Sequence, residues 1–351
     1  MGHNIAFIGF GGVGQGLANI LLHQKDKLIQ QEDLDVKVVA ISDMMKGSLY
    51  HPDGLDVNLV LETLHSTGSL NDYPDRRGLV KGLDSVETIR QTNADTIMEV
   101  TFTDVKTGQP AIHHCETAFQ AGKNVITTNK GPIALKYREL KKLAEQNGVF
   151  FGFEGTVMSG TPALRMPLSS LAGNEITEIT GILNGTSNYI LTKMEEGLAF
   201  DDALQEAKDN GFAEADPTND IEGFDVRYKA VILTNYLMDV PIDVQDVPCE
   251  GISHLTPEDM KEAQKQGERW KLLATIKKEN GNVTASVEPK RIPVSDPLAS
   301  VSSATNAILY QCDLAGPITL TGAGAGITET GYSLLIDLIH IHRRKKTVNA
   351  Y

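Results

Sequence analysis

The sequence is poor in cysteine and has no long apolar stretch. Its three cysteines, Cys115, Cys249 and Cys312, are odd in number and far apart, which suits a reduced cytoplasm better than a disulfide framework. No cysteine or histidine spacing resembles a zinc site. No apolar run approaches the roughly 20 residues of a membrane span, and the first residues lack the pattern of a signal peptide. We therefore expect a cytoplasmic protein that does not enter a membrane.

Positive charge is also scarce. The chain has 32 Lys and Arg against 46 Asp and Glu, a formal net charge of −14. This balance argues against nucleic acid or an anionic membrane as a partner. The apolar fraction of 41% and the charged fraction of 22% are those of a globular protein, and the length of 351 residues favours two domains.

A dinucleotide-binding fingerprint is present near the N-terminus. The run Gly9-Phe10-Gly11-Gly12-Val13-Gly14 lies between a predicted strand over residues 4–9 and a helical pattern that continues through Leu21. In G-x-G-x-x-G the first glycine makes a tight turn, the second lets a pyrophosphate approach the backbone, and the third lets the helix pack on the strand. The phosphates would lie at the helix N-terminus. A plain glycine-rich turn is the alternative, but the strand and helix around the motif favour the cofactor.

The second predicted strand, over residues 36–42, ends at Asp43. An acidic residue at this place can bind the ribose hydroxyls of the adenosine, which favours NAD over NADP. The nearby Lys46 could instead accept a 2′-phosphate, so the sequence leans only slightly to NAD. Asp43 could also do no more than cap its own loop.

Strands and helices alternate over the first 150 residues or so. Strands are predicted at 95–100, 124–127 and 149–153, with helices at 110–121 and 137–147, whereas residues 47–80 are polar with one helix near 57–64. Alternation of this kind predicts an α/β fold with a Rossmann-type, doubly wound parallel sheet. Thr101 and Lys130 follow two of these strands, at the end where ligands bind in open α/β sheets. His113, His114 and Cys115 are interpreted as ordinary helix residues.

After Glu154 the pattern changes to that of a second, α+β domain with a mixed sheet covered by helices. Strands are predicted at 175–183, 307–311 and 318–321, and the dipeptide Asn280-Gly281 predicts a hairpin. The glycine-rich run 322–326 opens a helix to about His342. We expect a nucleotide-binding domain over 1–153, completed by the C-terminal helix within 322–351. Residues 154–321 would form the second domain.

One stretch, residues 211–229, begins as a loop and ends as a helix. Asp225 and Lys229 are four residues apart on that helix and so share a face. A lysine on a largely apolar face is partly desolvated, which favours its neutral form and suits acid–base chemistry. Such a pair is more often a solvated helix decoration. The acidic residues before it, Glu214, Asp216 and Asp220, could be a charged surface loop or a cation site.

Taken together, six stretches resemble the homoserine dehydrogenase family over nearly the whole chain. They are residues 9–14, 128–132, 154–162, 183–190, 211–229 and 322–326. The resemblance implies reversible, NAD- or NADP-dependent reduction of L-aspartate 4-semialdehyde to L-homoserine, on the route to threonine and methionine. It also implies that residues 154–321 are the substrate-binding, catalytic and dimerisation domain of a homodimer, with the loop after Glu154 and the strands near 307–321 at or near the interface.

The resemblance also assigns roles to individual residues. Lys229 is the catalytic acid and base, and Asp225 holds the substrate and sets the environment of the lysine. Glu214 and Asp220 belong to the acidic substrate-binding cluster. Lys130 lies between cofactor and substrate. The remaining cofactor contacts implied are Thr101, Gly211 and Gly326.

A monovalent cation, usually sodium, is implied at backbone carbonyls of Glu154, Val157, Ser159 and Thr161. The pair Met158-Ser159 replaces a smaller Gly-Ala pair there, and Ala215 replaces a common proline in the acidic loop. The chain stops after its last predicted helix, so we expect neither an effector-binding extension nor a fused kinase, and weak or absent inhibition by threonine. Two alternatives stay open: another Rossmann reductase acting on a different amino semialdehyde, and a non-catalytic nucleotide-binding regulator.

Overall fold

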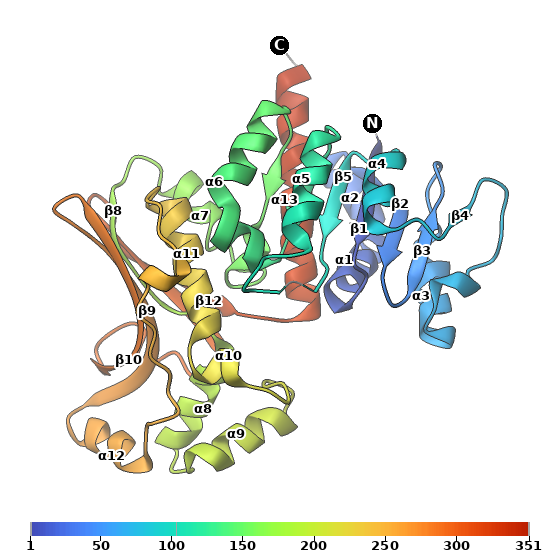
Figure 1. Cartoon of the computed structure of the whole chain (residues 1–351). Coiled ribbons are helices and arrows are strands. Elements are labelled where there is room, and N and C mark those ends of the chain that lie inside the picture. The colour runs from blue at the N-terminus through green and yellow to red at the C-terminus, as the bar shows by residue number, and fades with distance from the viewer. Residues whose placement is uncertain (1, 103, 350–351) are drawn as a thin grey trace. The chain divides into compact units, whose positions relative to one another are not determined.

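The structure, a computed structural model, describes residues 2–102 and 104–349, so residues 1, 103, 350 and 351 of the predicted nucleotide-binding domain lie outside it. The chain divides into two compact units (Figure 1). The first comprises Met1–Thr156 and Gly326–Tyr351, and the second is Val157–Ala325. Within the described residues, no helix is long and apolar enough to cross a membrane.

The first unit is built on a seven-stranded sheet with the order β4-β3-β2-β1-β5-β6-β7. Five of the strands are parallel, whereas β3 pairs antiparallel with β2 and β4 pairs antiparallel with β3. The strands are β1 (Gly2–Ile8), β2 (Asp35–Asp43), β3 (Gly47–Tyr50), β4 (Val80–Lys81), β5 (Thr96–Glu99), β6 (Asn124–Thr127) and β7 (Phe151–Gly152).

Helices cover both faces of this sheet, which is why β5 and β6 are buried along their whole length. Phe7 and Leu17 share one core cluster with Leu334 of the C-terminal helix, and Ile8 and Phe119 belong to the cluster on the other face. The helices are α1 (Gly12–His23), α2 (Lys25–Glu32), α3 (Val57–Thr67), η1 (Leu70–Asp72), α4 (Ser85–Gln91), α5 (Ala111–Gln120), α6 (Lys130–Gln146), η2 (Glu154–Thr156) and α13 (Ile327–Asn349).

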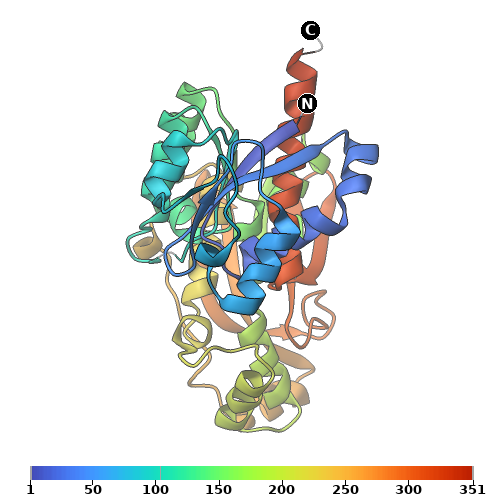
Figure 2. The same ribbon diagram turned by 90° about the vertical axis from the view of Figure 1, so that its right-hand side faces the viewer.

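The C-terminal helix α13 runs beside α1 (Figures 1 and 2). Glycines make this approach possible, because a Cβ on Gly16 would lie 2.4 Å from the carbonyl oxygen of Ile327. A Cβ on Gly331 would lie 2.7 Å from the backbone nitrogen of Leu17. The end of the chain therefore completes the core of the unit that its beginning forms.

Two features of the first unit differ from the sequence prediction. The strands β3 and β4 lie in the region predicted as polar with one helix, and they are too short, at four and two residues, for a periodic signal. Helix α6 starts at Lys130 instead of near Tyr137. Lys136 has non-helical backbone angles, and this kink separates the first turn, which contains Pro132, from the regular apolar pattern that follows.

The second unit contains a five-stranded sheet with the order β10-β9-β8-β11-β12. The predicted mixed sheet is corrected in one respect, because every neighbouring pair is antiparallel. The predicted hairpin is confirmed: Asn280 and Gly281, both at positive φ, join β9 to β10 as a two-residue turn requires. The strands are β8 (Ile176–Ile182), β9 (Glu268–Glu279), β10 (Asn282–Pro293), β11 (Thr305–Cys312) and β12 (Gly316–Ala323).

Helices α8 and α11 pack on this sheet, α8 against β9 and β11 and α11 against β9 and β10. Val226, Ala230 and Leu233 are fully buried on α11, which explains its apolar sequence. The helices of this unit are α7 (Arg165–Ser170), α8 (Gly185–Glu195), α9 (Phe200–Asp209), α10 (Thr218–Ile221), α11 (Phe224–Leu237), η3 (Val244–Asp246) and α12 (Pro257–Lys265).

Candidate active site

The glycine run forms the turn between β1 and α1. Gly9 has a φ of +85°, and a Cβ there would lie 2.6 Å from the carbonyl oxygen of Val100, so only glycine fits. Gly11 is the N-cap of α1 and offers no side-chain cap, and no acidic residue occupies the first turn. Nothing lies within 4 Å of the place where a Cβ on Gly11 would be. A backbone with room beside it at a helix N-terminus suits a pyrophosphate.

Gly12, Val13 and Gly14 form the first turn of α1. A Cβ on Gly14 would lie 3.3 Å from the carbonyl oxygen of Gly9, so this glycine lets the helix begin close to the strand. At the other end of the unit, Gly326 has a φ of +135° and precedes α13. The predicted cofactor-binding residues Gly9 to Gly14 thus share one turn, and Gly326 immediately precedes the helix that packs on α1.

Asp43 lies at the end of β2, as predicted, and turns its carboxylate to the glycine turn. Oδ2 accepts the backbone N–H of Phe10 at 2.7 Å, and Oδ1 accepts those of Met45 and Lys46, each at 3.0 Å. Burial raises the pKa of Asp43, but these hydrogen bonds and the Lys46 charge outweigh it and hold the pKa below its usual value. Asp43 therefore caps its loop and, as an anion, keeps lone pairs that can accept ribose hydroxyls.

Thr101 and Lys130 follow β5 and β6 at the carboxyl edge of the sheet. The Thr101 hydroxyl donates to Glu99 Oε1 at 2.5 Å. Lys130 is the first residue of α6 and is half-buried. A cation at a helix N-terminus is opposed by the helix dipole, so the stability of α6 does not explain this lysine.

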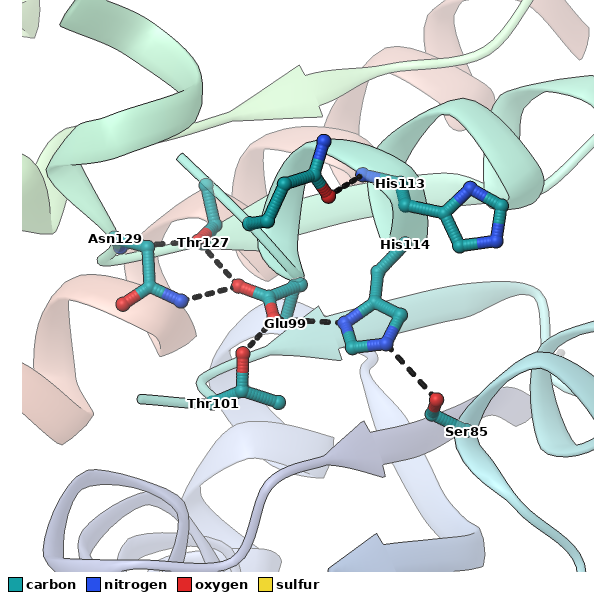
Figure 3. Close-up of polar contacts among 8 residues, drawn as sticks. Ser85, Glu99, Thr101, His113, His114, Thr127 and Asn129 are labelled. Carbon is teal, nitrogen blue, oxygen red and sulfur yellow. Dashed lines mark hydrogen bonds and ion pairs between the residues drawn. The ribbon is translucent and has the colours of Figure 1, made fainter. Parts of the chain in front are cut away.

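A carboxylate that the sequence reasoning missed lies between these two segments (Figure 3). Glu99, the last residue of β5, is completely buried and accepts hydrogen bonds from Thr101, His114, Thr127 and Asn129. His114, predicted as an ordinary helix residue, is instead a buried member of this network. An acidic residue ending an otherwise apolar strand was the available signal.

In the second unit, Lys229 and Asp225 are in contact on α11. The Lys229 ammonium donates to Asp225 Oδ2 at 2.7 Å and to the carbonyl oxygen of Leu183 at 2.5 Å. The lysine side chain is 7% exposed and that of the aspartate 16%. Gly223, at a φ of +76°, starts the helix so that Asp225 falls in its first turn. The pair is thus buried and held by a second segment of chain, unlike a solvated surface pair.

Asn184 joins this pair to the acidic loop, a role that the sequence reasoning missed. Its Nδ2 donates to Asp220 Oδ1 at 2.7 Å and to Asp225 Oδ2 at 3.1 Å, while its Oδ1 accepts the backbone N–H of Ser187 as the cap of α8. One amide therefore fixes two carboxylates relative to each other and to the carbonyl of the preceding Leu183.

The other residues of the acidic loop are placed differently. Glu214 is exposed, and Gly211 makes its turn at a φ of +73°. The loop is tied to α8 by the Thr186 hydroxyl, which donates to the carbonyl oxygen of Phe212 at 2.6 Å. Asp216 accepts hydrogen bonds from the hydroxyl and the backbone N–H of Thr218, which lower its pKa.

The four predicted cation ligands are divided between the units, since the boundary falls after Thr156. In the first unit Glu154 is buried and its N–H donates to Asp337 at 3.0 Å. In the second unit Val157 and Ser159 are buried and Thr161 is half-buried. The described residues contain no group of three or more His, Cys, Asp or Glu side chains that could hold a metal, but a site of backbone carbonyls is of a different kind.

Comparison with known proteins shows the family of this chain. A family model described as homoserine dehydrogenase matches residues 162–339, and one described as homoserine dehydrogenase, NAD binding domain, matches residues 9–154. An NAD(+)-dependent homoserine dehydrogenase of Pseudomonas canavaninivorans is 45% identical over 97% of this chain and 96% of that protein. The homoserine dehydrogenase of Methanocaldococcus jannaschii is 42% identical over 98% and 99%.

Solved structures give the same result. A crystal structure of a putative homoserine dehydrogenase from Archaeoglobus fulgidus has a TM-score of 0.87 at 33% identity, covering 97% of this chain and 99% of that one. A hyperthermophilic archaeal homoserine dehydrogenase mutant in complex with NADPH has a TM-score of 0.83 at 30% identity, covering 98% of both chains. The chain therefore belongs to the homoserine dehydrogenase family of NAD(P)-dependent oxidoreductases.

Proposed function

We propose that Lys229 is the proton donor and acceptor in the interconversion of L-aspartate 4-semialdehyde and L-homoserine. The observation that carries this proposal is the buried ammonium of Lys229, held by Asp225 at 2.7 Å and by the carbonyl oxygen of Leu183 at 2.5 Å. Two fixed acceptors on different segments restrict the lysine to one position. A proton donor needs such a fixed position to act on one substrate atom.

The chemistry divides between cofactor and side chains. When bound, the reduced nicotinamide cofactor supplies the hydride that the aldehyde carbon accepts. Lys229 donates the proton that the developing alkoxide oxygen needs, and in the reverse direction it takes that proton from the substrate hydroxyl. Lys130 adds positive charge that stabilises the developing alkoxide. Glu214, Asp220 and Asp225 provide the negative charge that the substrate ammonium group requires.

We propose that the glycine turn binds the cofactor pyrophosphate and that Asp43 favours NAD. The support is the N-terminus of α1 without a side-chain cap and the ionised carboxylate of Asp43 at the end of β2. Asp43→Asn should raise the KM for NAD by roughly tenfold, the usual order for one charge-assisted hydrogen bond. The KM for NADP should change less. An equal change for both cofactors would remove Asp43 from ribose recognition and leave it as a loop cap.

A monovalent cation at the carbonyls of Glu154, Val157, Ser159 and Thr161 is a further proposal. Its support is the backbone at Met158 and Ser159, two successive non-glycine residues with φ of +57° and +53°. Such conformations cost free energy and are concentrated at ligand sites. Activity should depend on sodium when choline replaces it at constant ionic strength. Identical rates in both salts would reject the site.

We also propose a homodimer in which β12 contributes to the interface. β12 ends the order of its sheet, none of its residues is buried, and Leu314 in the turn before it is 77% exposed. An edge strand beside an exposed leucine favours association. Leu314→Glu should reduce the mass measured by light scattering. Val294 is also an exposed apolar residue, but it follows β10 at the opposite edge of the sheet, so Val294→Glu should leave the mass unchanged. A monomeric native protein would reject the proposal.

The experiment that tests the catalytic assignment is oxidation of L-homoserine at alkaline pH, followed at 340 nm with NAD and NADP in parallel. Lys229→Ala should lower kcat/KM by roughly 100-fold or more. The control is Lys278→Ala, because Lys278 also lies 2.7 Å from a carboxylate, Glu175, but in an exposed pair. If Lys229→Ala keeps its activity, the proton transfer belongs to another residue.

The alternative substrates are tested in the same assay. If the native protein binds cofactor but leaves homoserine unchanged, a panel of other amino aldehydes and amino alcohols identifies the substrate class. If it binds cofactor and turns over none of them, the non-catalytic regulator is favoured. Preferential turnover of homoserine rejects both alternatives.

A further inference from the structure

We propose that Glu99 is a positioning residue for the cofactor site: its buried carboxylate holds the segment after β5 and the segment before α6 in register with the glycine turn. This inference rests on the proposed function, in which Thr101 and Lys130 contact the cofactor. It concerns a residue that touches neither substrate nor cofactor in that proposal. Glu99 acts instead through the residues that it binds.

Glu99 joins three segments of the first unit (Figure 3). Oε1 accepts the Thr101 hydroxyl at 2.5 Å and faces His114 Nδ1 at 3.2 Å, and Oε2 accepts the Thr127 hydroxyl at 3.2 Å and the Nδ2 group of Asn129. His114 comes from α5, Thr127 ends β6, and Asn129 is the N-cap of α6. One carboxylate therefore ties together both strand ends and the helix that begins with Lys130.

This network meets the glycine turn directly. A Cβ on Gly9 would lie 2.6 Å from the oxygen of Val100 and 2.8 Å from the Cα of Thr101. The residues that immediately follow Glu99 are thus packed against the first glycine of the fingerprint. A displacement of Thr101 would therefore move both its hydroxyl and the backbone that packs against Gly9 in the glycine turn.

The chemistry of the four partners suits a carboxylate. The two hydroxyls, the amide NH₂ of Asn129 and a protonated His114 Nδ1 all donate, and an ionised carboxylate only accepts. Glutamine has the same shape, but its NH₂ would replace one of the two acceptor oxygens. Whichever way the amide is placed, one N–H donor, of His114 or of Asn129, would then face another donor, whereas a hydroxyl could turn and accept. A buried donor without an acceptor is costly, so the strand ends must shift.

Stability of the sheet alone does not require this arrangement. A buried carboxylate at a strand end is expensive, and an apolar residue would fill the same place at lower cost. His114 extends the network to Ser85, whose hydroxyl lies 2.9 Å from its Nε2. Ser85 starts α4, away from Thr101 and Lys130 along the chain. The network thus has one arm at the cofactor-binding segments and one that only anchors a helix.

The two arms provide a matched test by titration of NADH and NADPH fluorescence. Glu99→Gln should raise the Kd of the cofactor by roughly tenfold or more, since small displacements at a binding constellation have effects of this size. Ser85→Ala removes a hydrogen bond from the same network and should leave that Kd within about twofold while it lowers Tm. A Glu99→Gln protein that loses Tm but keeps the native Kd would overturn the proposal and leave Glu99 as a structural residue.

A second variant covers the case in which Glu99→Gln does not fold. Asn129→Ala removes one donor to the carboxylate at a half-buried position and should raise the same Kd severalfold. In the double variant the effect should be no larger than that of Glu99→Gln, because Glu99 acts through Asn129. Independent, additive effects contradict the proposal. If the native protein binds neither cofactor, the proposed function itself is rejected. If the native protein and the Glu99→Gln protein bind the cofactor equally well, only the role of Glu99 is rejected.

Discussion

Two buried lysines in the second unit, Lys229 and Lys271, have similar surroundings but different partners. Each donates to one backbone carbonyl, of Leu183 at 2.5 Å and of Val301 at 2.7 Å. The second acceptor of Lys229 is the carboxylate of Asp225, whereas that of Lys271 is the neutral amide oxygen of Asn188 at 3.3 Å.

The pKa of Lys271 shows what burial alone does. Its fully buried side chain has a pKa lowered to about 8, mainly by desolvation; the Glu195 charge raises this pKa and the Arg269 charge lowers it further. A search for the catalytic lysine by shifted pKa alone would therefore select Lys271, a residue that joins β9 to α8. The contrast teaches that the acidic loop and the helix start, and not burial, distinguish Lys229.

The largest expected effect is a difference in kcat/KM when the two lysines receive the same substitution. Lys229→Met should lower kcat/KM by roughly 100-fold or more, because it removes the proposed proton donor. Lys271→Met should change kcat/KM by less than about threefold at a temperature at which both variants are folded. Homoserine oxidation with circular dichroism of each sample is the measurement. A comparable loss of kcat/KM in both variants would contradict a catalytic role that Lys229 has and Lys271 lacks.

The second effect is on stability and depends on pH. The pKa of Lys271 is about 8 in the folded protein and 10.5 as the reference value, so the unfolded chain binds the proton more tightly. Between these values stability should rise with pH, by about 3 kcal/mol in total from this group, and below pH 8 the full cost of the buried charge is present. Lys271→Met should remove that rise from the pH dependence of Tm. An unchanged profile in the variant would assign the rise to other groups.

A third prediction makes the surroundings of Lys229 resemble those of Lys271. Asp225→Asn replaces the charged acceptor by a neutral amide, so less negative charge stabilises the ammonium form. We expect kcat/KM to fall by roughly tenfold or more and its pH profile to move to lower pH. The profile of kcat/KM from pH 6 to 10 is the measurement. A lower rate with an unmoved profile would mean that Asp225 binds substrate without acting on the lysine.

The smallest effect concerns Asn184, which fixes Asp220 and Asp225. Asn184→Ala should lower stability by about 1 kcal/mol through the lost helix cap and lower kcat/KM by roughly tenfold. Thr256→Ala is the control, because Thr256 caps α12 in the same unit by accepting the N–H of Asp259 at 3.3 Å. It should cost similar stability and leave kcat/KM unchanged. Equal catalytic effects would reduce Asn184 to a cap.

Much of the first unit could be predicted because its signals are local. The glycine run, the apolar strand before it and the helix after it lie within about 20 residues, and the structure places all of them as expected. The hairpin at Asn280-Gly281 has the same cause, since two residues fix the turn. The strands β3 and β4 and the early start of α6 escaped prediction because short elements lack a period.

The sequence by itself determined the family and the pair Asp225 and Lys229, because a four-residue spacing on a helix brings two side chains onto one face. Only the tertiary structure decided what surrounds them. Leu183 is 46 residues from Lys229, Asn184 is 41 from Asp225, and Asn129 is 30 from Glu99. Contacts over such separations depend on how helices and strands pack, and hydrophobic periodicity carries no information about them. The second acceptor of the lysine and the buried carboxylate of the cofactor unit are therefore properties of the fold.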